Sequence, residues 1–391
     1  MFENFLPYRQ ENATLFQQQF GRSKQIAHSL LLHGSRFTGR MSFALEIARI
    51  LSCRHDGKED CICPSCKEFN FLTMSNVVIL SHRDHNLRIS AAFDLFEKLE
   101  TEMSRRILIR QIRIMLMAYH VSFAEQSDSK KSAQFSKASD VDMLLRDFQD
   151  TEIQDSLKLA KELKKNVNSL IQGNSGNITI DQIRQVAKWT SKTSFDRTSR
   201  FIILENIESA AVGANNSLLK MLEEPAPGTY IILISEHPNR LLPTIRSRVQ
   251  SHHIVPLTVD ERKRVFENFF FADYHHYDSI EQFVLFKAGL PLEQIEKASR
   301  DYIGSIISKN ALNSRQLGDI CTLVDEKNHL DYFISMVDKN LSSHLNKGNV
   351  TVNDVIRIQT AMNETFQKGE LFNQQRKVLV EMLYYRLLEE L

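Results

Sequence analysis

The segment HGSRFTGRMS has the glycine spacing of a phosphate-binding loop. Gly34 and Gly39 stand at the separation found in G-x-x-x-x-G-K-[ST], whose backbone N–H groups cradle nucleotide phosphates. Arg40 fills the lysine position, and Met41 fills the position of the hydroxyl that would hold Mg²⁺. A thioether does not ligate that hard cation. The segment therefore predicts a damaged nucleotide site or an ordinary turn between a strand and a helix.

A second pair of polar residues follows the apolar run Phe201–Leu204. Glu205 and Asn206 stand where a phosphate-loop ATPase carries the acidic residues that orient Mg²⁺ and polarise water. The amide of Asn206 cannot act as a base. The pair therefore predicts that rapid nucleotide hydrolysis is unsupported at this site, and Glu205 by itself fits a solvated strand end equally well.

Four of the five cysteines lie within 14 residues of one another, in the pattern C-x7-C-x-C-x2-C. Four thiolates can surround Zn²⁺ tetrahedrally, and such closed coordination leaves no position for a substrate. We therefore expect a structural zinc site formed by Cys53, Cys61, Cys63 and Cys66. Nearby His55 is an alternative ligand, and four reduced thiols without metal are the simpler interpretation.

The elements that must position these residues are alternating strands and helices. Continuous β-branched runs are typical of parallel strands that are covered on both faces. They occur at Asn76–Leu80, Phe201–Leu204 and Tyr230–Ile234, and a short apolar run at Ser29–Leu32 enters the glycine-containing turn. Helical spacing of apolar residues follows this turn, and a further helix is predicted at Ile178–Trp189. The alternation predicts an α/β layer domain from residue 1 to about 255.

The rest of the chain is expected to be helical. Residues 65–172 contain neither Gly nor Pro, which favours helices. Apolar residues recur at helical spacing from Leu108 to Tyr119 and from Ile153 to Leu170, and the intervening segment Ser122–Ser139 is polar. We therefore predict a helical hairpin with a mobile polar tip. Beyond Pro256, periodic helices continue to the last residue.

Composition excludes several classes of protein. At 391 residues the chain exceeds the size of one hydrophobic core, and 42% hydrophobic residues exclude wholesale disorder. The 49 basic residues nearly cancel the 48 acidic ones, so nucleic-acid binding would require a local patch. No apolar run approaches the roughly 18 residues of a membrane span, and the first residues lack a signal-peptide pattern. We therefore expect a cytoplasmic protein.

Two longer blocks carry a family resemblance. NNSLLKMLEEPAPGTYIILIS (215–235) and RLLPTIRSRV (240–249) closely resemble the AAA+ core of bacterial DNA polymerase III clamp-loader subunits. Weaker similarities are IAHSLLLHG, the cysteine cluster, ITIDQIRQV and NQQRKVLVEML. The resemblance implies an AAA+ core domain over 1–255 with a zinc module at about 53–66, a small helical lid over 256–305 and a helical collar for oligomerisation over 306–391. The segment from about 89 to 176 resembles nothing in the usual pattern and is predicted to be a helical insertion.

Within this family, gamma and tau are active ATPases and delta prime is a non-hydrolysing partner. Arg40, Met41 and Asn206 each depart from the ATPase pattern, which favours the delta prime type. The resemblance then implies that ATP is either not bound or not hydrolysed by this chain. It also implies gamma or tau and delta as partners, with the sliding clamp and primed DNA reached through the complex. The family usually shows C-x8-C-x2-C-x2-C, so Cys61 is displaced by one residue.

Ser247 and Arg248 resemble the first two residues of the family's Ser-Arg-Cys motif, with Val249 replacing the cysteine. In the family this arginine points into the ATP site of a neighbouring subunit. A guanidinium is planar and permanently charged, so it can bridge phosphate oxygens as an arginine finger. The simpler interpretation is a surface arginine in a salt bridge, and Arg246 is close enough to compete for the role.

Two other functions remain open from the sequence. One is a divergent, gamma-like or tau-like ATPase that binds and hydrolyses nucleotide through Arg40 and Glu205. The other is a zinc-containing DNA-binding module whose affinity comes from basic residues of the insertion. Those residues are Arg105, Arg106, Arg110 and Arg113.

Overall fold

The computed structural model describes residues 8–20, 26–81, 85–120, 123, 129–172, 178–191, 199–210, 212–371 and 374–390. The chain divides into two compact units, Met1–Ala288 and Gly289–Leu391. Residues 121–122, 124–128 and 173–176 of the predicted insertion lie outside the described part. The three-domain division at 255/256 and 305/306 stays a prediction.

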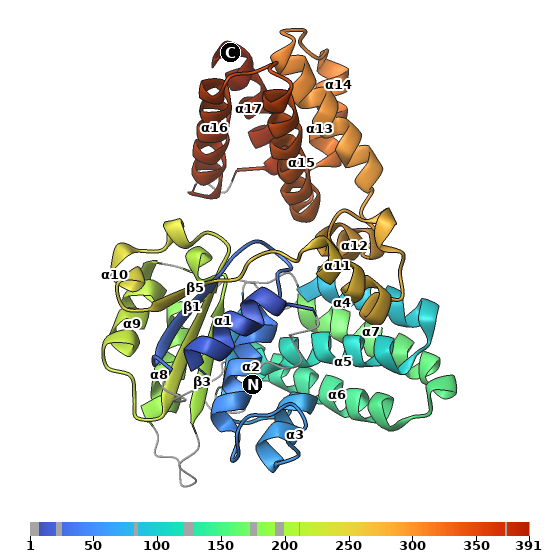
Figure 1. Cartoon of the computed structure of the whole chain (residues 1–391). Helices are drawn as coiled ribbons and strands as arrows, with labels where there is room; N and C mark the ends of the chain where they lie inside the picture. Colours follow the sequence, from blue (N-terminus) through green and yellow to red (C-terminus); the bar gives the residue numbers. More distant parts are fainter. Residues whose placement is uncertain are drawn as a thin grey trace. The chain divides into compact units, whose positions relative to one another are not determined.

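The first unit is built on a five-stranded sheet in the order β2-β3-β4-β1-β5 (Figure 1). All neighbouring strands are parallel. The strands are β1 (Ser29–His33), β2 (Val77–Ser81), β3 (Arg200–Glu205), β4 (Thr229–Ser235) and β5 (Gln250–His253). The four strands predicted from apolar runs are confirmed, with each end within one residue. β5 was not predicted because its sequence, QSHH, is short and polar.

Helices cover both faces of this sheet, so it is the middle of three layers. They are α1 (Gln10–Phe20), α2 (Arg40–Ser52), α3 (Pro64–Phe71), α8 (Ile180–Ser191), α9 (Val212–Glu223) and α10 (Pro243–Arg246). Alternate strand residues enter two different cores: Leu32 and Ile203 pack with α1, α2 and α3, whereas Leu31 and Ile202 pack with α8 and α9. This burial on both faces explains the continuous apolar runs. The predicted α/β class is confirmed.

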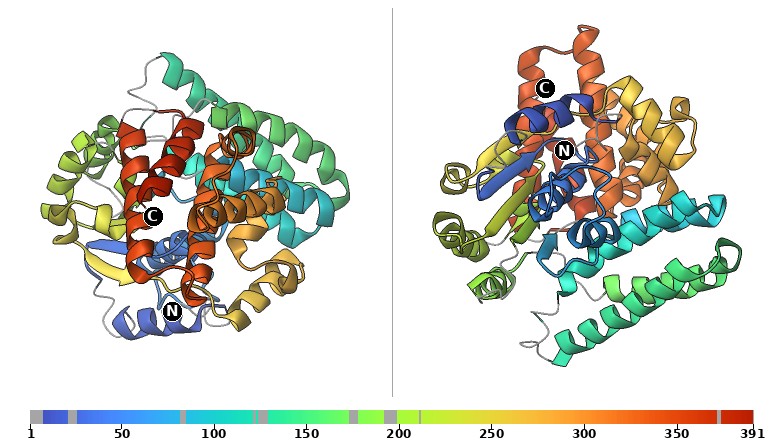
Figure 2. Two further views of the ribbon diagram at one scale, coloured as in Figure 1. Left: turned by 90° about the horizontal axis from the view of Figure 1, so that it is seen from above. Right: turned by 60° about the horizontal axis from the view of Figure 1, so that its bottom comes forward.

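The predicted insertion contains four helices with a core of their own. They are α4 (His85–Leu99), α5 (Glu102–Leu116), α6 (Ser129–Asp150) and α7 (Ser156–Gln172). The predicted hairpin tip is wrong for residues 129–139, which form the start of α6. Val141, Leu145 and Phe148 are buried at helical spacing in this core, and α6 packs beside α7 (Figure 2). The polar residues before them extend the exposed face of the same helix.

The remaining elements are also helical, as predicted. The first unit ends with α11 (Val259–Val265) and α12 (Ile280–Lys287). The second unit consists of α13 (Leu292–Ile307), α14 (Ser314–Leu323), α15 (Lys327–Asn346), α16 (Val352–Leu371) and α17 (Arg376–Glu390). Its core includes fully buried Tyr302 and Tyr384 and the isolated thiol of Cys321. Among the described helices, none combines the length and the apolar composition needed to cross a bilayer.

Candidate functional site

The predicted phosphate loop lies between β1, which ends at His33, and α2, which begins at Arg40. Both glycines adopt backbone conformations that L side chains rarely adopt, with φ 153° at Gly34 and 82° at Gly39. A Cβ atom at Gly34 would lie 2.4 Å from the carbonyl oxygen of Ile254, directly after β5. The loop backbone is therefore fixed by close packing against the edge of the sheet.

Replacing Gly34 by alanine is expected to destabilise the fold by about 2–5 kcal/mol, because left-handed strain and a steric clash add together. Gly228→Ala is the matched control: φ there is 72°, but no atom lies within 4 Å of the added Cβ. That change should cost only the backbone strain, about 1–2 kcal/mol. Urea unfolding of both variants checks this, and equal losses of unfolding free energy would contradict the close approach.

Arg40, in the lysine position of the loop, is already paired inside the protein. Its side chain is 5% exposed, and its Nη2 atom lies 2.9 Å from Oε1 of Glu236, which directly follows β4. The same carboxylate oxygen lies 3.7 Å from Nε of Arg36. Buried arginine–carboxylate pairs form strong, charge-assisted hydrogen bonds. The cation that would meet a phosphate is thus held by a carboxylate.

Other groups around the loop also differ from those of a nucleotide site. Met41 is 5% exposed and packs in the apolar core, so its side chain offers the loop no ligand. Nη1 of Arg36 lies 3.4 Å from Oε1 of Glu281 on α12. Phe37 has a left-handed backbone, φ 58°, and the guanidinium of Arg88 on α4 lies 4.2 Å from its ring centre. The loop is therefore contacted by two helices that come from distant parts of the sequence.

His33 adds little positive charge to this edge of the sheet. Burial, followed by the proximity of His253 and Arg40, lowers the pKa of His33 below its usual value. His33 is therefore neutral at pH 7. Its ring stacks on that of His253 at 5.1 Å, which joins β1 to β5.

Glu205 and Asn206 lie at the same edge of the sheet as the loop, because parallel strands end at a common edge. Glu205 is 5% exposed, and its Oε2 accepts a 2.7 Å hydrogen bond from Oγ of Ser81 at the end of β2. The alternative of a solvated strand end is therefore wrong. Asn206 has φ 55°, its N–H donates to the carbonyl of Ile234, and its buried Oδ1 has no partner among the described residues. These two positions thus hold one carboxylate, already hydrogen-bonded, where an ATPase has two.

Ser247 and Arg248 lie at the amino-terminal ends of the strands, whereas the loop lies at their carboxyl ends. They follow α10 and precede β5, which runs parallel to β1 with Leu30 beside Gln250 and His33 beside His253. The structure therefore does not bring Arg248 together with Gly34 or Glu205. This separation follows from the strand direction alone.

The guanidinium of Arg248 forms an ion pair on the surface. Its Nη2 atom lies 2.6 Å from Oε1 of Glu223, the last residue of α9, and Nη1 donates to the carbonyl of Thr244. The side chains of Arg248 and Glu223 are 35% and 47% exposed. Arg246 is also exposed and has no ion pair among the described residues. The pairing matches the simpler interpretation from the sequence, but both partners remain accessible.

The four clustered cysteines converge on one point at the end of α2 and the start of α3. The Sγ atoms of Cys53, Cys61, Cys63 and Cys66 all lie within 4.8 Å of one another. Four thiolates at about 2.3 Å from a tetrahedral Zn²⁺ would lie about 3.8 Å apart, so this donor set fits the ion. Cys61 is part of the group despite its displaced spacing. His55 is outside it, with Nδ1 3.3 Å from Sγ of Cys61.

Three charged residues near these sites were missed by sequence reasoning. Glu236 is 196 residues from Arg40, its partner, and no local pattern links them. Glu46 and Arg49 lie on α2 at a spacing of three and are 8% and 4% exposed. The signal that could have found them is a pair of opposite charges on a helix face that is otherwise apolar.

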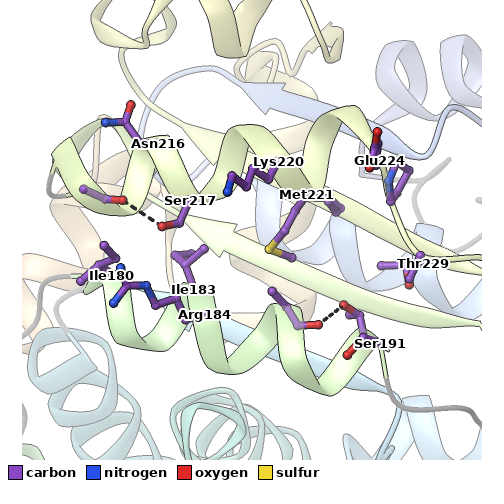
Figure 3. A pocket seen from close by; sticks show the side chains of 16 residues that line it. Ile180, Ile183, Arg184, Ser191, Asn216, Ser217, Lys220, Met221, Glu224 and Thr229 are labelled. Atoms are coloured by element: carbon purple, nitrogen blue, oxygen red, sulfur yellow. Dashed lines mark hydrogen bonds between the residues drawn. The ribbon is translucent and has the colours of Figure 1, made fainter.

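A separate groove lies between α8 and α9, and Figure 3 shows its lining. Its volume is about 610 Å³. Apolar Ile183 and Met221 line it together with Arg184, Ser217 and Lys220. None of the predicted site residues borders it, so it is distinct from the phosphate loop and the cysteine cluster.

A family model and several curated relatives indicate one family. A family model described as DNA polymerase III, delta subunit, matches residues 9–127 and 117–258, more than half of the chain. DNA polymerase III subunit delta' of Pseudomonas aeruginosa is 44% identical over 71 residues, 18% of this chain and 22% of that protein. The Bacillus subtilis subunit of the same name is 39% identical over 88 residues, 22% of this chain and 27% of that protein. The chain thus matches about a quarter of the length of these relatives.

Among solved structures, a Thermotoga maritima protein described as DNA polymerase III gamma subunit-related is 19% identical. The match covers 60% of this chain and 91% of that one, with a TM-score of 0.28. A score this low supports no argument about fold or function.

Proposed function

The chain belongs to the DNA polymerase III delta subunit family as a delta prime-like clamp-loader protein, and from this premise we propose that it is a non-hydrolysing subunit of the clamp loader. In this role it supports ATP-dependent loading of the sliding clamp on primed DNA. Its partners are the gamma or tau and delta subunits, and it acts in the cytoplasm at the nucleoid. The observation that carries the proposal is the ion pair between buried Arg40 and partly buried Glu236.

This pair supports a loop without ATPase chemistry. A γ-phosphate approaching Arg40 would come close to the Glu236 carboxylate on Nη2, and the two anions would repel each other. Mg²⁺ would find a thioether at Met41 and an amide at Asn206. Of the two positions that carry acids in an ATPase, only Glu205 keeps a carboxylate, and it already accepts a hydrogen bond from Ser81. These features argue against the divergent-ATPase alternative.

The isolated full-length chain is therefore expected to show no ATP turnover above a blank without protein. Isothermal titration with Mg·ATP should give no heat of binding, because the loop cation is already paired. The gamma subunit of the same organism, assayed in parallel, is the positive control. Tight binding followed by steady phosphate release from this chain would contradict the proposal and favour the divergent ATPase.

We also propose that Arg248, with Ser247 beside it, acts in trans as an arginine finger. The position of these residues supports this, because the edge of the sheet opposite the loop cannot serve the chain's own nucleotide site. The ion pair with Glu223 is exposed and therefore weak, worth about 0–1 kcal/mol. A triphosphate on a neighbouring subunit could thus replace Glu223 at little cost.

The cysteine cluster is proposed to hold one structural Zn²⁺. Support comes from four sulfur donors converging within 4.8 Å, which would fill all four tetrahedral positions and leave none open for substrate. Bound zinc would cross-link the end of α2 to the start of α3.

The DNA-binding alternative has less support. Arg113 pairs with Asp142, and Arg105 pairs with Glu102 and donates to the carbonyl of Thr151. Two of the four basic residues of the predicted stripe are thus already engaged within the insertion, which weakens the stripe as a site for phosphates.

A further inference from the structure

Arg49 is a buried arginine whose five N–H donors all have acceptors. Its Nε and one Nη2 donor reach the two carboxylate oxygens of Glu46, at 2.8 and 2.7 Å. The other Nη2 donor reaches the carbonyl of Gly57 at 2.9 Å, and Nη1 reaches the carbonyl of Lys58 at 3.1 Å and Sγ of Cys66 at 3.2 Å. A guanidinium has five donors, so this environment uses all of them. One of the acceptors is a sulfur atom of the proposed metal site.

These contacts attach the cysteine cluster to α2 at two further points. The carbonyl of Lys58 also accepts a hydrogen bond from the N–H of Cys61, at 3.3 Å. Gly57 has φ 67°, and a Cβ atom there would lie 3.0 Å from the side chain of Ile50, so this turn packs directly on the helix. Arg49 therefore holds both the turn that precedes Cys61 and the sulfur of Cys66.

The electrostatics of the site explain why a guanidinium suits this position. Four thiolates around Zn²⁺ carry a net charge of −2, and Cys66 and Arg49 are 0% and 4% exposed. Solvent cannot screen that charge well at such depth. A cationic N–H donor on one sulfur offsets part of it, and Glu46 on the far side of the guanidinium fixes its orientation.

We propose that Arg49, oriented by Glu46, is a positioning residue of the metal site that holds Cys66 and the Cys61 turn in coordinating geometry. The inference rests on the proposed zinc site. Outer partners of metal ligands typically contribute about 10–100-fold to metal affinity. Arg49 contacts the ligand Cys66 directly and is connected to Cys61 through the carbonyl of Lys58.

The test compares metal binding by the full-length wild-type chain, Arg49→Met and Arg54→Met. Arg54 is exposed, lies next to Cys53 and has no described side-chain contact with the cluster, so its replacement changes the net charge equally. Zn²⁺ affinity is measured by competition with a chromophoric chelator. The Co²⁺-loaded proteins report on the sulfur atoms through the thiolate-to-cobalt charge-transfer band. We expect about 10–100-fold weaker Zn²⁺ binding and a shifted band for Arg49→Met only.

Two further variants guard against a simple folding defect. Arg49→Lys keeps the charge but has three donors in place of five, and it should give an intermediate affinity. Glu46→Gln keeps the side-chain shape and should shift the cobalt band with far-UV circular dichroism unchanged. Wild-type affinity and an unshifted band in Arg49→Met, or equal losses in Arg54→Met, would overturn the inference while leaving the zinc site intact. A wild-type chain that binds neither metal would overturn both.

Discussion

Replacing Arg248 by alanine should slow ATP turnover at the neighbouring subunit's site by about 10³-fold or more in the reconstituted clamp loader, the contribution expected of an arginine finger. The total rate of ATP turnover by the complex should fall by the fraction that this one site contributes. The physical reason is the loss of a planar cation that stabilises charge on the transferred phosphoryl group. Steady-state phosphate release measures the rate, and gel filtration checks that the complex still assembles.

Arg246→Ala is the matched control for this change. Arg246 is an exposed arginine two positions earlier, so its removal changes the charge equally and should leave turnover at the wild-type rate. Glu223→Gln removes the surface partner of Arg248 and should alter stability by less than about 1 kcal/mol. Unchanged turnover in Arg248→Ala would remove the proposed role, and slow turnover in Arg246→Ala alone would transfer it to that residue.

Substituting Cys66 by serine is expected to lower the zinc content from about one ion per chain to a trace. Cys66 is fully buried among the other three cysteines, and a structural zinc site with only three sulfur ligands loses the closed coordination that gives its stability. Apparent binding free energies of about 10–16 kcal/mol for structural zinc make this one of the largest single effects expected here. Elemental analysis gives the metal content, and hydrogen exchange should show faster opening of residues 53–71.

The control is Cys321→Ser, which also places a hydroxyl at a buried thiol, 6% exposed, but in the second unit. It should leave the zinc content unchanged. A wild-type chain purified without stoichiometric zinc, or Cys66→Ser retaining it, would contradict the proposed site.

Local patterns were sufficient for much of the fold. Runs such as Phe201–Leu204 identified the central strands because burial on both faces leaves a continuous apolar signature. β5 carries no such signature, because three of its four residues are exposed and only His252 is buried. The start of α6 was misread because its first turns are polar, and the helix is held by Val141 and Phe148 further along.

The candidate sites divide in the same way. The cysteine spacing and the loop glycines are local patterns, so the sequence was enough to identify them. The pairing of Arg40 with Glu236 joins positions 196 residues apart, and it exists only because β1 and β4 are neighbours in the sheet. The burial of Glu205 likewise depends on Ser81, 124 residues away. Chain topology decides such contacts, and no single segment encodes it.

The opposite placement of the loop and Arg248 gives the molecule a polarity. Under the proposed role, the side that carries Arg248 supplies a catalytic guanidinium to a neighbour. The side that carries the loop holds no triphosphate for another subunit's arginine to contact. Related subunits that assemble head to tail are joined through heterologous contacts. In such a row, Arg248 of a second copy of this chain would face the loop of the first copy and find no triphosphate there. Such a subunit can occupy only the end of the row, once per assembly. The row therefore cannot close into a ring through the same kind of contact that joins its other subunits.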